Sequence, residues 1–82
     1  MFSKELYGQR LLEIRNLHNE TQSDLAKSVG TAISSISEME KGKKTTTLER
    51  FAMICEHYHV SADYLLGLSD DPKLPPVSPP ET

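Results

Sequence analysis

The chain has 82 residues, of which 37 % are hydrophobic and 26 % are charged, and its net charge is −3. This length and composition predict one small domain, and the charge excludes a nucleic-acid binder that relies on overall positive charge. The single cysteine excludes an intramolecular disulfide, and no apolar run has the length of a signal peptide or a membrane span. We therefore expect a cytoplasmic protein with no membrane partner.

The first predicted helix covers residues 4–18. Asn19 then tolerates the left-handed conformation that ends a helix. Apolar side chains recur at helical spacing and form one stripe along this segment: Tyr7, Leu11 and Ile14, with Leu6 and Leu17 beside them.

A short second helix follows. Thr21, with Asp24 three positions later, has the pattern of a capping box, and Gly30 ends the helix. Its apolar residues are Leu25, Ala26 and Val29.

The third helix is expected over about residues 32–41, opened by Thr31 with Ser34 and stopped by Gly42. Its inward positions are Ile36, Met39 and Glu40. Helical spacing places another set on the opposite face: Ile33, Ser34, Ser37, Glu38 and Lys41.

A polar loop then leads to the fourth helix. Thr46 and Glu49 have the spacing of a capping box, so this helix should begin near Thr47. Its predicted buried stripe is Leu48, Phe51, Ile54, Cys55 and Tyr58. Val60 is apolar in the next turn. Ser61 then caps a fifth helix over residues 62–66, which Gly67 ends.

All five prolines lie between positions 72 and 80 and exclude helix there. We expect a domain over residues 1–69, followed by a Pro-rich tail or linker stub over residues 70–82. No segment alternates with period two, so the fold class is all-α, a compact five-helix domain. The two short helices around the Gly turn make a central helix-turn-helix candidate.

The charges are unevenly distributed along the chain. Residues 1–55 carry eight basic and seven acidic side chains, whereas residues 56–82 carry one basic and five acidic. This asymmetry fits one anion-binding face and one face that avoids anions, although ordinary solvated charge gives the same pattern.

Several ordered motifs between Tyr7 and Gly67 resemble the Cro/XRE family, which includes the DNA-binding domains of lambdoid phage repressors and many bacterial regulators. The matching pieces are Arg10-Leu11-x-x-Ile14-Arg15, Thr21-Gln22-x-x-Leu25-Ala26, Gly30, Ile36-Ser37-x-Met39-Glu40-Lys41-Gly42-Lys43, Leu48-Glu49 and Val60-Ser61-x-Asp63-Tyr64-Leu65-Leu66-Gly67. The resemblance implies a lambda-repressor-like fold. The chain departs from the family at Glu20, usually apolar, at Thr31, often Val, and at the recognition positions Ala32 and Ile33.

The resemblance implies that the third helix lies in the major groove of double-stranded DNA. Residues expected to read bases are Ala32, Ile33, Ser34, Ser37 and Glu38. Glu38 can accept a hydrogen bond from a cytosine amino group. Alternatively, it is a solvated charge that only repels phosphate.

Phosphate contacts are expected on both sides of this helix. Gln22 stands at a helix N-terminus, where free N–H groups attract anions, or it only caps that helix. The other candidates follow the third helix and are either backbone contacts or a solvated loop: Lys41, Lys43, Lys44, Thr45, Thr46 and Thr47.

By the same resemblance, Arg15 and Glu40 pair across the first and third helices, the alternative being two independent surface charges. One domain contacts a half-site, so we expect a homodimer on a pseudo-palindromic operator. The expected dimer surface is the region of the fifth helix, with Tyr64, Leu66 and Leu68.

The sequence offers no catalytic constellation, so we expect no enzyme and no cofactor. His57 and His59 do not share a helix face, so we expect no metal site, and Cys55 reads as a core thiol. The predicted function is a transcriptional regulator that binds double-stranded DNA sequence-specifically and acts as a repressor. The alternative is a protein-interaction module of the same fold, such as an antitoxin or the partner of a regulator, with secondary or no DNA binding.

Overall fold

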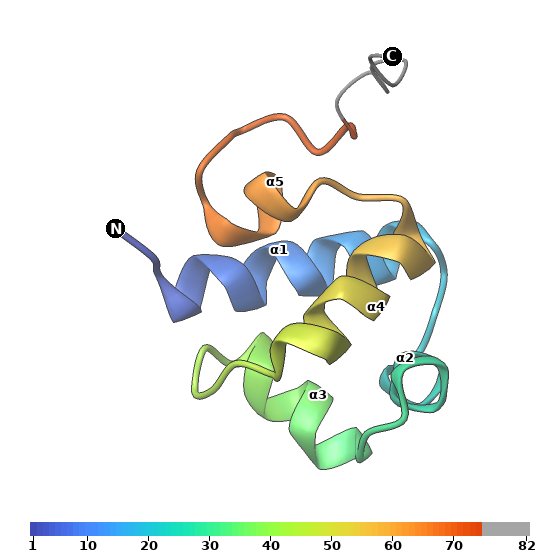
Figure 1. Ribbon diagram of the computed structural model, residues 1–82. Coiled ribbons are helices and arrows are strands. Elements are labelled where there is room, and N and C mark those ends of the chain that lie inside the picture. The colour runs from blue at the N-terminus through green and yellow to red at the C-terminus, as the bar shows by residue number, and fades with distance from the viewer. Residues whose placement is uncertain (75–82) are drawn as a thin grey trace.

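The computed structural model describes residues 1–74, and these form five helices without a strand among them. The helices are α1 (Lys4–Leu17), α2 (Gln22–Val29), α3 (Ile33–Glu40), α4 (Leu48–Tyr58) and α5 (Ala62–Leu66). The predicted all-α fold of five helices is therefore confirmed (Figure 1). Most of the expected tail, residues 75–82, lies outside the described part of the chain.

Helix α1 begins after Ser3, whose Oγ accepts a hydrogen bond from the Leu6 N–H at 3.1 Å. Tyr7, Leu11 and Ile14 are buried, as the apolar stripe predicts. Leu17 is the exception, since it is 76 % exposed at the last position of the helix. Asn19 adopts the expected left-handed conformation, with φ of 55°.

The start of α2 carries the predicted capping box: Thr21 Oγ1 accepts from the Asp24 N–H at 3.0 Å, and Asp24 Oδ2 accepts from the Thr21 N–H at 2.9 Å. Gly30 ends the helix at φ of 67°, a conformation that other residues adopt at a cost. The expected cap of α3 was wrong. Ala32 occupies that position without a side-chain hydrogen bond, so neither Thr31 nor Ser34 caps this helix.

Helix α4 begins one residue later than the predicted capping box requires. Thr47, rather than Thr46, accepts from a backbone N–H of the first turn, that of Arg50, at 3.2 Å. Leu48 is therefore the first helical residue, and it is 82 % exposed, so its assignment to the buried stripe was wrong. Ser61 caps α5 as expected.

The core lies where these helices meet. Helix α1 lies between α5 and α3 (Figure 1), and α2 packs against both α3 and α4. Gly8 allows the closest approach, because a Cβ atom at this position would collide with the Met39 carbonyl oxygen of α3. None of the helices in residues 1–74 is long and apolar enough to cross a membrane.

Candidate nucleic-acid interface

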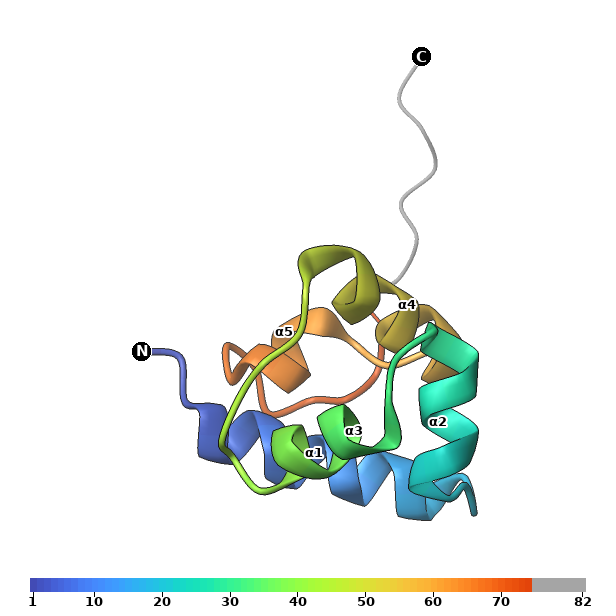
Figure 2. The same cartoon turned by 90° about the horizontal axis from the view of Figure 1, so that it is seen from below.

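Helices α2 and α3, joined by a three-residue turn, form a helix-turn-helix unit on the lower side of the molecule in Figure 1, the side seen in Figure 2. The turn is held by a hydrogen bond from the Thr31 N–H to the Ala26 carbonyl at 2.9 Å. Ile36 and Met39 anchor α3, since they are 0 % and 1 % exposed. These contacts fix which face of α3 remains available.

The available face of α3 carries most of the residues that the sequence assigns to base reading. Ile33 is 51 % exposed, Ser34 and Glu38 are also exposed, and Ser37 is half-buried. Ala32 is exposed at the N-terminal end of the same helix. The structure thus brings the five residues to one helix, with hydroxyl groups, one carboxylate and one branched apolar side chain.

Basic side chains follow α3 directly. Lys41 and Lys43 are exposed, whereas Lys44 is half-buried because its Nζ donates to Ser35 Oγ at 3.0 Å. A hollow of about 300 Å³ opens beside this contact, and hydroxyl groups and cations line much of it: Thr31, Ser35, Lys44, Thr45, Thr46, Thr47 and Arg50, with Met39.

Arg50 is a cation of this hollow that the sequence analysis missed. Its Nη2 donates to the Gly30 carbonyl at 3.1 Å, so α4 touches the turn between α2 and α3. One signal for it existed. A basic residue in the first turn of a helix opposes the helix dipole, which suggests that another partner holds it there.

A buried ion pair joins α1 to α3. Arg15 Nε lies 2.7 Å from Glu40 Oε2 and its Nη2 lies 2.9 Å from Glu40 Oε1, with the two side chains 10 % and 5 % exposed. The hydrogen bond from Arg15 to Glu40 raises the pKa of Arg15, despite the opposing effect of burial. Two charges buried in this bidentate geometry hold α3 against α1.

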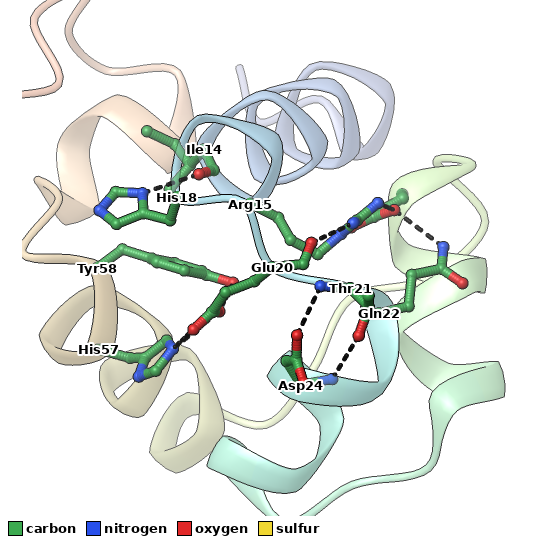
Figure 3. A network of polar contacts seen from close by, with 10 residues as sticks. Ile14, Arg15, His18, Glu20, Thr21, Gln22, Asp24, His57 and Tyr58 are labelled. Atoms are coloured by element: carbon green, nitrogen blue, oxygen red, sulfur yellow. Dashed lines mark hydrogen bonds and ion pairs between the residues drawn. The ribbon is translucent and has the colours of Figure 1, made fainter.

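Gln22 joins the same pair from the start of α2. Its Nε2 donates to Glu40 Oε1 at 3.0 Å, and Thr21 rather than Gln22 caps the helix (Figure 3). The carboxylate of Glu40 therefore ties together α1, α2 and α3.

Glu20 forms a second polar cluster on the other side of Arg15. Tyr58 donates its hydroxyl to Glu20 Oε1 at 2.7 Å, and His57 Nε2 lies 2.9 Å from Glu20 Oε2. Burial alone would raise the pKa of Glu20, but the hydrogen bonds from Tyr58 and His57 outweigh it and lower that pKa. Burial and the hydrogen bond to Glu20 raise the pKa of Tyr58. Sequence reasoning noted Glu20 only as a departure and His57 only as a poor metal ligand.

The region of α5 expected to form a dimer surface is partly occupied by contacts within the chain. The guanidinium carbon of Arg10 lies 4.2 Å from the ring centroid of Tyr64, which is half-buried, and Arg10 also donates to the Tyr64 and Ser69 carbonyls. Leu66 is half-buried as well, whereas Leu68 is 71 % exposed. Leu68 is therefore the most accessible of the three predicted residues.

The remaining candidates lack the geometry of a metal or nucleophile site. Among residues 1–74, no three side chains of His, Cys, Asp or Glu are grouped to hold a metal ion. Cys55 is half-buried against the core, and burial raises the pKa of its thiol, as in an unreactive cysteine.

Known proteins resemble this chain in sequence and in fold. A model of the family described as helix-turn-helix matches residues 11–65. The chain is 40 % identical over 67 residues to the uncharacterized HTH-type transcriptional regulator YobD of Bacillus subtilis (strain 168), covering 82 % of this chain and 60 % of that protein. It is 31 % identical over 72 residues to the antitoxin PezA of Streptococcus pneumoniae serotype 4, covering 88 % of this chain and 44 % of that protein.

A solved structure of the P22 c2 repressor protein in complex with a synthetic operator is also similar. It aligns with a TM-score of 0.71 and 30 % identity, covering 74 % of this chain and 92 % of the repressor chain. The match covers less than two thirds of either curated relative's length. The predicted Cro/XRE-type resemblance and its lambda-repressor-like fold are confirmed.

Proposed function

The chain belongs to the helix-turn-helix family, and from this premise we propose that it regulates transcription as a repressor by binding an operator in double-stranded DNA. The fold is that of DNA-binding transcription regulators. Helix α3 would enter the major groove, and its exposed residues would read base edges.

The observation that carries this proposal is the position of α3 between two sets of anion-binding groups. The N-terminus of α2, where helix geometry leaves N–H groups without a partner inside the helix, precedes α3 in the chain. Lys43, Lys44 and Arg50 follow it. Phosphate contacts on both sides of a base-reading helix fix its register on the duplex, while the helix itself supplies specificity.

Base reading by Glu38 is tested with Glu38→Gln. The change turns a pure acceptor into a mixed donor and acceptor, so the preferred base should move from cytosine toward adenine. Selection of bound sites from random duplex DNA, done with both proteins, measures this change. Glu13→Gln is the matched control, because Glu13 is an exposed glutamate on α1. If the wild type and Glu38→Gln recover the same sites, Glu38 does not read a base.

We further propose that two copies bind a pseudo-palindromic operator through the α5 region, since one such domain contacts a half-site only. Leu68→Glu should lower operator affinity without unfolding the protein, because the two DNA-binding units are no longer linked. Leu17→Glu is the matched control, with a leucine of 76 % exposure at the far end of α1. Unchanged sedimentation and unchanged operator binding in Leu68→Glu would place the dimer surface elsewhere.

A second candidate function is that of a protein-interaction module with secondary or no DNA binding. The similarity to the antitoxin PezA and the acidic C-terminal part of the chain favour it. Retention of a duplex at low salt distinguishes the two candidates. A protein that binds no duplex under these conditions would fit the second candidate alone.

A further inference from the structure

Three side chains form a polar contact between the end of α4 and the loop that precedes α2, and we name Glu20, His57 and Tyr58 the Glu20 latch. Both carboxylate oxygens of Glu20 lie 2.9–3.0 Å from His57 Nε2, and Glu20 Oε1 also accepts from the Tyr58 hydroxyl at 2.7 Å. Figure 3 shows Glu20 pointing from its loop toward these two side chains. The Glu20 and His57 side chains are 24 % and 29 % exposed, so solvent and protons reach the pair.

The backbone of Glu20 continues this contact toward the candidate DNA-binding unit. Its carbonyl accepts a hydrogen bond from Arg15 Nη1 at 2.7 Å. The same guanidinium holds Glu40 at the end of α3, and Glu40 accepts from Gln22 at the start of α2. One line of hydrogen bonds therefore connects the end of α4 to both helices of the helix-turn-helix unit.

The loop between α1 and α2 is held by backbone hydrogen bonds at the end of α1 and by the capping box of α2. Asn19, the residue before Glu20, has φ of 55°, which asparagine tolerates at a helix end, and the Glu20 N–H donates to the Arg15 carbonyl at 3.2 Å. The latch adds a further hold from α4. Without the latch, the loop before α2 would lose its side-chain contacts to α4.

Other ionisable groups around His57 and Glu20 come from each neighbouring element. From α1, the His18 ring packs on the Tyr58 ring, with 4.9 Å between the ring centroids. His18 Nδ1 lies within hydrogen-bond distance of the Ile14 carbonyl oxygen, at 2.9 Å. From α2, the charge of Asp24 disfavours the ionised form of Glu20. On α4 itself, the flanking groups of His57 are Glu56 and Tyr58. Glu20 is thus the carboxylate that contacts His57 directly.

We propose that Glu20 is a positioning residue that couples the protonation of His57 to DNA affinity, so that binding strengthens as His57 becomes protonated. The proposal rests on the proposed DNA-binding function. A protonated imidazole donates from Nε2 and also adds a positive charge beside the Glu20 carboxylate, and histidine gains this charge between about pH 8 and pH 5. A tighter latch increases the fraction of molecules whose α2 and α3 are held for binding, and apparent affinity rises with that fraction.

The experiment measures the affinity of the whole chain for a duplex selected from random-sequence DNA, at constant ionic strength, from about pH 7.5 to about pH 5.5. The wild type should bind about two- to fivefold more tightly at the lower pH, the range that a partly exposed ion pair supplies. His57→Gln and Glu20→Gln should lose this gain. Tyr58→Phe removes only the hydroxyl donor, so it should weaken binding at every pH while the gain remains.

His59→Asn is the matched control. His59 is the next histidine along the chain, exposed and left-handed at φ of 52°, a conformation that asparagine tolerates. His59 lies two positions after His57 at the end of α4, so a general attraction between a histidine cation and DNA would be weakened by either substitution. The control should keep the full pH gain of the wild type. Circular dichroism at each pH establishes that the compared proteins are folded.

Three other results would overturn the proposal. Equal pH profiles for the wild type and His57→Gln would show that the latch does not act on binding, although the proposed function would stand. Loss of the gain in His59→Asn as well would assign it to general charge. A wild type that binds no duplex at any pH would overturn the proposed function, and this inference with it. If Glu20→Gln does not fold, the comparison of the pH profiles of duplex affinity for His57→Gln and His59→Asn decides the outcome.

Discussion

The buried pair of Arg15 and Glu40 allows the sharpest test of how the helix-turn-helix unit is held. We consider Glu40→Gln, which keeps the shape of the side chain and removes its charge. The guanidinium of Arg15, whose side chain is 10 % exposed, then lies buried without a counter-charge. Removing one partner of a buried pair costs about 3–5 kcal/mol. Because glutamine still accepts one hydrogen bond from Arg15, we expect the lower end, about 3 kcal/mol.

This loss is large for so small a domain. A chain of this size has a free energy of unfolding of about 4–12 kcal/mol, and each 1 kcal/mol lowers the Tm of a domain of about 60–100 residues by about 4–8 °C. Urea unfolding followed by circular dichroism measures the free energy directly. The double variant Arg15→Met with Glu40→Met buries no charge, so it should be more stable than Glu40→Gln by at least about 1 kcal/mol.

Two results would refute this reasoning. A Glu40→Gln variant within about 0.5 kcal/mol of the wild type, the range of ordinary surface substitutions, would mean that the pair is open to water in solution. A double variant that loses the sum of the losses measured for Arg15→Met and Glu40→Met alone would mean that Arg15 and Glu40 act independently.

Three further predictions concern separate parts of the molecule. Changing Lys43 and Lys44 to Ala should reduce the slope of log affinity against log salt by about one unit for each phosphate that the protein no longer neutralises, and an unchanged slope in a salt titration would remove both from the interface. Gly8→Ala should lower the free energy of unfolding in urea by about 1–3 kcal/mol, because the alanine Cβ would collide with the Met39 carbonyl oxygen. A variant as stable as the wild type would contradict that close approach. The folded pKa of Glu20 lies below its ordinary value of 4.5, so its stabilisation is present above that pH and is lost as the pH falls through the folded value. The stability advantage of the wild type over Glu20→Gln should therefore shrink in acid unfolding below about pH 4.5, and a constant advantage would argue against the ionised latch.

The helices were predictable because their signals are local. Apolar residues at helical spacing and a glycine after each of α2 and α5 indicate which segments are helical, and the observed bounds differ from the predicted ones by at most one residue. The caps were less predictable where neighbours are chemically equivalent. Thr46 and Thr47 offer the same hydroxyl, and Thr47 is the one that caps α4.

The exposed face of α3 was predictable from local spacing too, because it lies opposite the buried residues Ile36 and Met39. Arg50 was not predicted, because its acceptor is the Gly30 carbonyl, twenty positions earlier in the chain. No periodicity within α4 indicates such a partner. The Arg15–Glu40 pair, 25 positions apart, was predicted only because the family resemblance supplied it.

The polar contacts of Arg15, Glu20 and Glu40 point to one general reason for these omissions. A small domain has little apolar surface to bury, so the position of α3 depends on more than Ile36 and Met39. Charged groups that are buried must find partners, since an unpaired buried charge is very costly. A charged residue within an otherwise apolar pattern thus predicts that a partner exists, but not where along the chain it lies. Glu20, which stands where the family usually has an apolar residue, is such a case: its partners are thirty-seven and thirty-eight positions away, at the end of α4.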